Sequence, residues 1–134
     1  MISHITTMEI TTEINKEKNI RRHIVKGTID RSEFIQSLKE IYNSSDFDPK
    51  MNALWDLQEA DFSDVFSEDI TAFIDSFDRK WGCGEEIKIA LVVSSDLSYG
   101  MSRMFEIMRG NLTSNEIVVF RDINKAKEWI EVET

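Results

Sequence analysis

Apolar residues recur along this chain with two different periods. In some segments they alternate with polar residues or form short uninterrupted runs, which are the patterns of half-buried and fully buried strands. Strands are therefore predicted over residues 8–14, 20–26, 53–57, 87–93 and 117–120. The polar turn 15–19 is short enough to join the first two strands as a hairpin. The run 87–93 is almost wholly apolar, which predicts a central strand covered on both faces.

Between these strands, apolar residues return at every third or fourth position, as in helices that bury one face. Residues that can cap a helix precede these segments. The predicted starting or capping residues are Asp30, Ser67, Asp96 and Asp122. The resulting order, ββαβαβαβα, implies an α/β fold with a mostly parallel sheet, an opening hairpin and helices packed on the sheet. Because the chain has one proline, five glycines and no linker-like stretch, residues 1–134 are expected to form a single domain.

Charge and cysteine content narrow the classes of function and location. The 134 residues include 16 Lys and Arg against 25 Asp and Glu, a formal net charge of −9. Such a surface repels a phosphate backbone, so nucleic acid is not an expected partner. The single cysteine, Cys83, cannot form an intrachain disulfide, which favours a reducing compartment. With neither a signal-peptide pattern nor an apolar run of about 20 residues, we expect a cytoplasmic protein with no membrane span.

Residues that usually hold metals or activate nucleophiles are sparse. His4 and His23 have no partner at the spacing of metal ligands, and one cysteine cannot complete a zinc site. The acidic stretch 61–69 lacks the spacing of a calcium loop. No glycine-rich phosphate-binding or dinucleotide-binding motif follows a predicted strand. The sequence therefore predicts no metal, no cofactor and no catalytic group.

Three stretches carry a resemblance to a known family. They are Phe47-Asp48-Pro49-Lys50-Met51-Asn52-Ala53-Leu54-Trp55-Asp56-Leu57, then Ala90-Leu91-Val92 followed by Asp96-Leu97-Ser98-Tyr99-Gly100-Met101-Ser102-Arg103-Met104, and finally Val119-Phe120-Arg121-Asp122 with Ala126 and Trp129. Together they resemble the bacterial SpoIIAA-like family, small proteins related to STAS domains, from Met8 to Ile130. The resemblance implies a STAS-like fold and a non-catalytic switch or sensor role.

The best-known STAS relatives bind a partner kinase and are phosphorylated on a serine in an Asp-Ser-Ser-Gly stretch. This chain departs from that pattern, because the stretch from Gln58 to Asp69 contains no such motif. Ser67 stands where the phosphoserine would be. Its neighbours Glu68 and Asp69 would repel an added charge of about −2, which argues against phosphorylation there.

Candidate ligand-binding residues come from the ends of the predicted parallel strands, because ligands of open α/β sheets bind outside the carboxyl ends of the strands. The residues expected at that edge, including two from the helix that begins there, are Asp56, Ser94, Ser95, Tyr99, Arg103 and Arg121. Simpler roles compete with ligand binding. Ser94 and Ser95 have helix capping as an alternative. For Arg103 and Arg121, the alternative is a structural ion pair with Asp56 or Asp122. For Gly100, the alternative is packing of the helix on the sheet.

A methionine stripe, formed by Met101, Met104, Phe105 and Met108, lies at helical spacing. Methionine suits both cores and adaptable binding surfaces. The stripe therefore has three interpretations: part of the core, the wall of a lipid pocket, or a dimer face.

These observations support three functional hypotheses. The first is a non-catalytic STAS-like regulatory or binding module for a partner protein or a small anionic or amphiphilic ligand. The second is a SEC14-like carrier of lipid or another hydrophobic ligand, which would use the methionine stripe with Trp55, Phe62 and Phe66. The third is an enzyme that uses Asp56, Ser95 and Arg121, for which the sequence offers only isolated polar residues. A homodimer is compatible with each.

Overall fold

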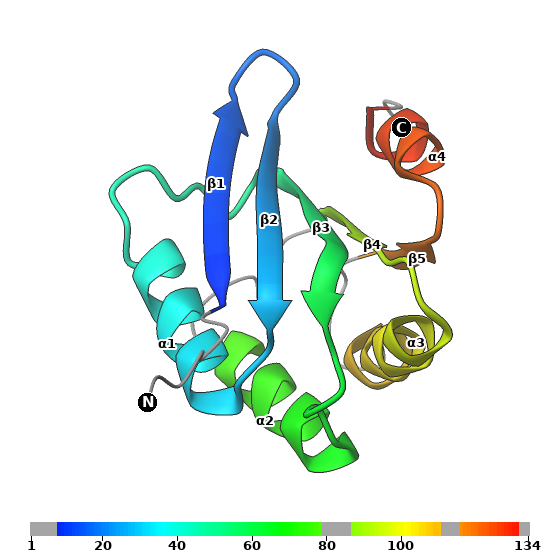
Figure 1. The fold of residues 1–134 in the computed structure, drawn as a ribbon. Helices are drawn as coiled ribbons and strands as arrows, with labels where there is room; N and C mark the ends of the chain where they lie inside the picture. Colours follow the sequence, from blue (N-terminus) through cyan, green and yellow to red (C-terminus); the bar gives the residue numbers. More distant parts are fainter. Residues whose placement is uncertain (1–7, 79–86, 111–115, 132–134) are drawn as a thin grey trace, which may run out of the picture.

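Strands and helices follow one another in the predicted order (Figure 1). The structure is a computed structural model that describes residues 8–78, 87–110 and 116–131. Its elements are β1 (Glu9–Asn15), β2 (Ile20–Thr28), α1 (Arg31–Tyr42), β3 (Asn52–Asp61), α2 (Ser67–Asp78), β4 (Lys88–Val92), α3 (Asp96–Gly110), β5 (Glu116–Phe120) and α4 (Ile123–Glu131). The order ββαβαβαβα is confirmed. His4 and Cys83, which bear on the metal and redox arguments, lie outside the described residues.

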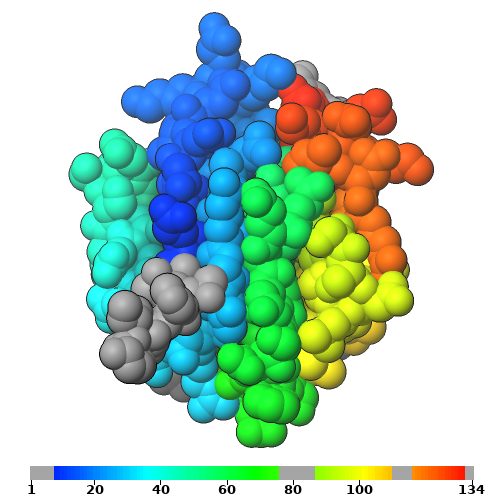
Figure 2. All heavy atoms as spheres, in the orientation of Figure 1, coloured from blue at the N-terminus to red at the C-terminus, as the bar shows by residue number. Residues whose placement is uncertain are grey.

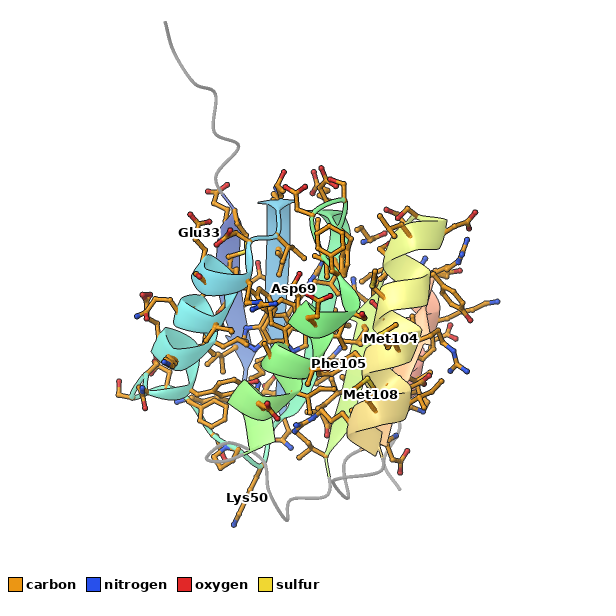
Figure 3. The ribbon with its side chains drawn as sticks, turned by 90° about the horizontal axis from the view of Figure 1, so that it is seen from below. Glu33, Lys50, Asp69, Met104, Phe105 and Met108 are labelled. Atoms are coloured by element: carbon orange, nitrogen blue, oxygen red, sulfur yellow. The ribbon has the colours of Figure 1, made fainter. Side chains whose placement is uncertain are left out.

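The strands form one mixed sheet in the order β1-β2-β3-β4-β5. β1 and β2 pair antiparallel as the predicted hairpin, and the pairs β2–β3, β3–β4 and β4–β5 are parallel. Because the strands lie in chain order and crossovers are right-handed, the three crossover helices fall on one face. Figure 3 shows α1, α2 and α3 side by side over that face, whereas α4 packs on the opposite one. The N-termini of the crossover helices thus meet the carboxyl ends of the parallel strands at one edge, here called the carboxyl edge.

Two apolar clusters hold these layers together. The larger lies between the sheet and α1, α2 and α3, and it includes Phe34, Leu38, Trp55, Leu57 and Phe73. The smaller lies under α4 and consists of Leu54, Ala90, Val92, Ala126 and Ile130. Every residue of β4 is buried, so the predicted central strand covered on both faces is confirmed. In the part of the chain that the structure describes, no helix has the length and apolar character that a bilayer crossing needs.

Beyond α4, no helix among the described residues packs on the second face of the sheet over β1, β2 and the adjoining part of β3, which we call the open face (Figure 2). Ion pairs cross this face between neighbouring strands, from Arg22 to Asp56 at 2.8 Å and from Lys26 to Glu59 at 3.6 Å. Charged pairs of this kind stabilise a solvated sheet face and discourage further packing against it. Of the described helices, α1, α2 and α3 therefore cover one face of the sheet, whereas α4 covers only part of the other.

β3 continues beyond its predicted end at Leu57 and reaches Asp61. The added residues keep pairing with β2, whose register against β3 shifts between Ile24 and Lys26 at a β-bulge. Side chains alternate between the faces of a strand, so the extra residue changes the face that later residues of β3 occupy. Gly27 lies beside this irregularity at a φ of 91°, a conformation that favours glycine.

Candidate functional site

The segment after β4 crosses the carboxyl edge and is tied to both neighbouring strands. The Ser94 hydroxyl donates to the carbonyl oxygen of Gln58 at 2.7 Å. The Val93 N–H donates to the carbonyl oxygen of Phe120 at 2.9 Å. Ser94 is exposed but has a structural partner, and its bond holds the entry to α3 in place.

Ser95 caps α3 together with Ser98. The Ser95 hydroxyl accepts from the Ser98 N–H at 3.0 Å, and the Ser98 hydroxyl accepts from the Ser95 N–H at 3.1 Å. This arrangement is a capping box in which a serine replaces the usual Glu or Gln. The prediction that Asp96 caps this helix is wrong, because Asp96 is its first helical residue. Its carboxylate is therefore available to a partner outside the helix.

That partner is Arg121, which completes a polar cluster at the edge. Nη2 of Arg121 donates to Oδ1 of Asp96 at 2.8 Å, and the guanidinium carbon lies 4.5 Å from the centre of the Tyr99 ring. The predicted ion pairing of Arg121 with Asp56 or Asp122 is wrong, since Asp122 instead accepts backbone N–H bonds at the start of α4. We call Asp96, Tyr99 and Arg121 the Arg121 cluster. It joins the end of β5 to the first turn of α3.

Asp56 lies apart from this cluster. Its expected position at a strand end is wrong, because the extension of β3 places it within the strand, opposite Val92. Its carboxylate accepts from Nη2 of Arg22 at 2.8 Å, from the Gln58 backbone N–H at 3.2 Å and from Nε2 of Gln58 at 2.9 Å. Burial alone would raise the pKa of Asp56, but these hydrogen bonds and the Arg22 charge together lower it. Asp56 therefore carries a negative charge, and its side chain lies on the open face of the sheet.

Arg103 is also separate, because its guanidinium pairs with Glu106 within α3. Its predicted pairing with Asp56 or Asp122 is therefore wrong. Of the six predicted residues, the structure gathers four at the carboxyl edge: Ser94, Ser95, Tyr99 and Arg121. Helix–sheet packing does not explain Gly100 either, since a Cβ built there would meet no atom within 4 Å.

Ser67 is the first residue of α2 and is exposed. Its neighbour Asp69 accepts from the Phe66 N–H at 2.8 Å and pairs with the guanidinium of Arg31. The Phe66 N–H lowers the pKa of Asp69 most; burial opposes the shift, and Arg31 adds to it. Asp69 therefore keeps its negative charge beside Ser67, which adds to the argument against a phosphate there.

Two large apolar side chains are exposed at the carboxyl edge. Phe66 precedes α2 with 61% of its surface exposed, and Leu97 lies in the first turn of α3 with 47% exposed. Since α2 and α3 pack together and each follows a parallel strand, both side chains lie at the edge that carries the Arg121 cluster. Sequence reasoning did not single out Leu97, although it continues the methionine stripe by one helical turn.

The methionine stripe is mostly a boundary of the core. Met101, Met104 and Phe105 are partly buried against the larger cluster, whereas Met108 is 37% exposed. Figure 3 shows the labelled members of the stripe along α3, beside α2. An apolar cavity of about 60 Å³ lies between α2, α3 and the sheet. Pockets for small molecules usually measure at least about 300 Å³, so this space does not hold a lipid chain in the described conformation.

Sequence reasoning missed two buried polar residues of β2. Arg21 is 4% exposed and His23 is fully buried, and both lie on the strand face that Val25 contributes to the larger cluster. The alternation of side chains along a strand could have indicated that both are buried, because Arg21 and His23 share the strand face of Val25. Within the described ranges, no three His, Cys, Asp or Glu side chains gather as a metal site requires.

Comparison with known proteins supports the fold. No family model matches the chain, and no curated protein matches its sequence. Among solved structures, the chain is similar to an uncharacterised protein of the DUF3478 family from Shewanella loihica that has a SpoIIAA-like fold. The TM-score is 0.57 at 18% sequence identity, and the match covers 97% of this chain and 98% of the other. The SpoIIAA-like fold implied by the sequence resemblance is confirmed.

Proposed function

We propose that this protein is a non-catalytic binding module that engages a partner protein through its carboxyl edge. The observation that carries the proposal is the exposure of Phe66 and Leu97 beside the Arg121 cluster. Exposed apolar side chains that share one edge and are rimmed by polar residues are typical of a surface that contacts another protein. Aromatic and arginine side chains next to such a patch are the residue types that contribute most to protein interfaces.

The Arg121 cluster is organised before any partner arrives. Arg121 is held by Asp96 and lies over Tyr99, so little side-chain freedom remains to be lost on binding. The guanidinium still has donors beyond the one that meets Asp96. A partner segment that combines an apolar side chain with a carboxylate or carbonyl oxygen would match this edge. The switch or sensor role implied by the STAS resemblance is consistent with such a surface.

The other hypotheses have less support. An enzyme built on Asp56, Ser95 and Arg121 would need three side chains that have separate structural partners: Arg22, Ser98 and Asp96. A lipid carrier would need α2 and α3 to separate, because the cavity between them is about 60 Å³. Native mass spectrometry of the purified protein tests this carrier, since a bound lipid would add several hundred daltons that are lost on denaturation.

Site-specific photocrosslinking in cells of the source organism tests the proposed function. A benzophenone amino acid is placed at Phe66 or Leu97, and at Lys127 on α4 as a control far from the carboxyl edge. We expect one discrete heteromeric adduct from positions 66 and 97 and none from position 127. Arg121→Ala should weaken that adduct while the protein remains folded, as judged by circular dichroism.

Two outcomes contradict the proposal. Equal crosslinking from all three positions would indicate nonspecific contact, and absence of any adduct at 66 and 97 would indicate that the edge has no partner. An adduct with twice the mass of the chain would replace the separate partner with a homodimer.

A further inference from the structure

One side of α3 is an uncharged surface that the rest of the described chain covers only in part. Its residues recur at intervals of three and four, so they are neighbours on one face of the helix. This α3 face consists of Leu97, Gly100, Met101, Met104, Ile107 and Met108. It begins at the carboxyl edge with Leu97 and continues along the helix, away from the Arg121 cluster.

The α3 face is exposed at both of its ends. Leu97 is 47% exposed near the start of the helix, and Ile107 and Met108 are 57% and 37% exposed near its end. Met101 and Met104, between these ends, are half-buried. Four large apolar side chains are exposed in the part of the chain that the structure describes, and three of them lie on this face. Apolar exposure concentrated on one surface is typical of an interaction site.

This face is turned outward and toward α2. Met101 lines the small cavity between the two helices together with Ile70 and Phe73 of α2. Residues three, four and seven positions away from Met101 share its side of the helix. Figure 3 accordingly shows Met104 and Met108 along α3, next to α2. A segment that covers the α3 face would therefore also contact the outward side of α2.

Gly100 leaves room for the backbone of another segment. A Cβ added at this position would meet no atom within 4 Å, so the surface of α3 is low there. Glycine is the residue that lets another backbone approach closely. Apolar side chains at intervals of three and four on either side of such a position match the contacts of a second helix laid along the first.

The neighbouring outward side of α2 is acidic. α2 contains four Asp or Glu residues and no Lys or Arg. Glu68 and Asp75 are exposed, and neither forms an ion pair within the described ranges. The exposed cation of α3, Arg103, is paired with Glu106. A segment on the α3 face therefore meets uncompensated negative charge on its α2 side.

We infer that the α3 face binds an amphipathic helix of a partner protein, whose apolar side meets Met104 and whose Lys or Arg residues lie toward α2. This inference rests on the proposed function, because it names the kind of segment that continues from the carboxyl edge. A second copy of the chain would bring another net charge of −9, and the same charge repels an anionic membrane. A basic helix satisfies both the apolar spacing and the charge of this surface.

Synthetic helices and the full chain with ¹³C-methyl-labelled methionine test the inference. The probe is a stapled peptide of about 18 residues, long enough to hold a helix, with leucines on one side and lysines on the other. One matched peptide has glutamates in place of the lysines, and another has the composition of the probe with its leucines scattered around the helix. We expect the probe to shift the methyl signals of Met101, Met104 and Met108 but not those of Met8 and Met51. It should bind at least about tenfold more tightly than either matched peptide.

Variants at exposed positions separate the α3 face from a general attraction between charges. Ile107→Lys places a cation on the face and should weaken binding of the basic probe by about tenfold. Asp75→Lys should weaken it by about threefold and narrow its advantage over the acidic peptide. Glu128 is also exposed, but it lies on α4, across the sheet. Glu128→Lys makes the same change of charge as Asp75→Lys and should leave the affinity within about twofold of wild type.

Equal affinity of the basic and acidic peptides would overturn the inference. Equal effects of Asp75→Lys and Glu128→Lys would also overturn it, because binding would then depend on net charge alone. Methyl shifts as large with the scattered peptide as with the probe would show that no apolar helix face is recognised.

A benzophenone amino acid at Ile107, in the crosslinking experiment described above, separates this inference from the proposed function. Adducts of one mass at positions 66, 97 and 107 that are lost in Asp75→Lys and kept in Glu128→Lys would support both. Adducts at 66 and 97 without one at 107 would overturn the inference and leave the proposed function in place. An adduct at 107 with twice the mass of the chain would replace the partner helix with a second copy.

Discussion

The hydroxyl oxygens of Ser95 and Ser98 lie 2.8 Å apart, and each side chain accepts a hydrogen bond from the backbone N–H of the other residue. Ser95 is exposed, whereas Ser98 is buried within the first turn of α3. This reciprocal pair fixes where α3 begins. It thereby also positions Asp96 and Tyr99, which hold Arg121.

Removing either hydroxyl should destabilise the protein. We expect Ser95→Ala to lower the free energy of unfolding by about 1 kcal/mol, the usual cost of a lost N-cap. Ser98→Ala should cost about 1–3 kcal/mol, because it leaves the Ser95 N–H without its acceptor. Urea unfolding measures both, and the double variant should cost less than the sum of the two. Ser95→Asp, which keeps an acceptor at the cap, is the control and should remain close to wild type.

Gly100 is an exposed helical glycine with open space around its Cα. We expect Gly100→Ala to raise the free energy of unfolding by about 0.5–1 kcal/mol, because alanine loses less backbone entropy in a helix. Thermal or urea unfolding measures whether the free energy of unfolding rises or falls. A destabilised variant would contradict this prediction. If a partner backbone approaches at Gly100, the same variant should also weaken the crosslinked adduct formed at position 97.

The ion pair between Arg22 and Asp56 stabilises the open face of the sheet. Asp56→Ala should lower the free energy of unfolding by about 1–3 kcal/mol, since Arg22 and Gln58 lose a largely buried acceptor. The lowered pKa of Asp56 means that its contribution is present above the unfolded pKa, near pH 4, and is lost as the pH falls through the folded value. Urea titrations at several acidic pH values should therefore show a shallower loss for Asp56→Asn than for wild type.

We expect His23 to make the stability of the protein sensitive to mild acid. Its folded pKa of about 3 lies below the unfolded value of 6.5, so between these values the unfolded state binds the additional proton. Stability attributable to His23 therefore falls as the pH drops below 6.5, by at most about 1.4 kcal/mol for each pH unit. The groups that face it are Thr12, Arg21 and Trp55, none of which is acidic.

Urea unfolding between pH 7 and pH 5 tests this dependence. His23→Phe keeps a ring against Trp55 but does not titrate, so its unfolding free energy should change less with pH than that of the wild type. What matters is the slope with pH, because the substitution also changes stability at every pH. Parallel slopes for the two proteins would show that His23 does not control the acid response.

The exposed Phe66, just before α2, and the buried Phe73, within α2, should respond differently to substitution. Phe66→Ser removes a side chain that is mostly in water, so stability should stay within about 0.5 kcal/mol of wild type. Phe73→Ala opens a hole in the larger cluster and should cost about 3–5 kcal/mol. Urea unfolding gives both values. A large loss in Phe66→Ser would indicate that Phe66 stabilises the fold, which would remove the main support for a docking surface.

The predicted elements agree closely with those observed, because each depends on local periodicity. The phase of Phe34, Leu38 and Tyr42 is enough to define the buried side of α1, and all three are buried. Ends of elements were harder to predict. β3 passes Leu57 because Glu59 to Asp61 pair with Lys26 to Thr28 of β2, and those partners are distant in sequence.

The candidate site was predictable only in part. Ser94, Ser95, Tyr99 and Arg121 follow from strand ends and a helix start, which depend on chain order alone. The partners in the ion pairs could not be predicted from chain order. Arg121 meets Asp96, and Arg22 meets Asp56, because of the register between strands and the direction in which α3 enters.

The order of elements and a mostly parallel sheet with an opening hairpin could be predicted from the sequence, because both follow from local periodicity. The placement of the strands in chain order is a tertiary feature, and with right-handed crossovers that order puts the three crossover helices on one face. Tertiary structure alone decided which polar side chains share an environment. Arg21 and His23 look like ordinary charged residues of a hairpin until α1 and the Phe47 segment cover them. A strand has two faces separated by a single residue of register, and only packing against distant segments selects between them.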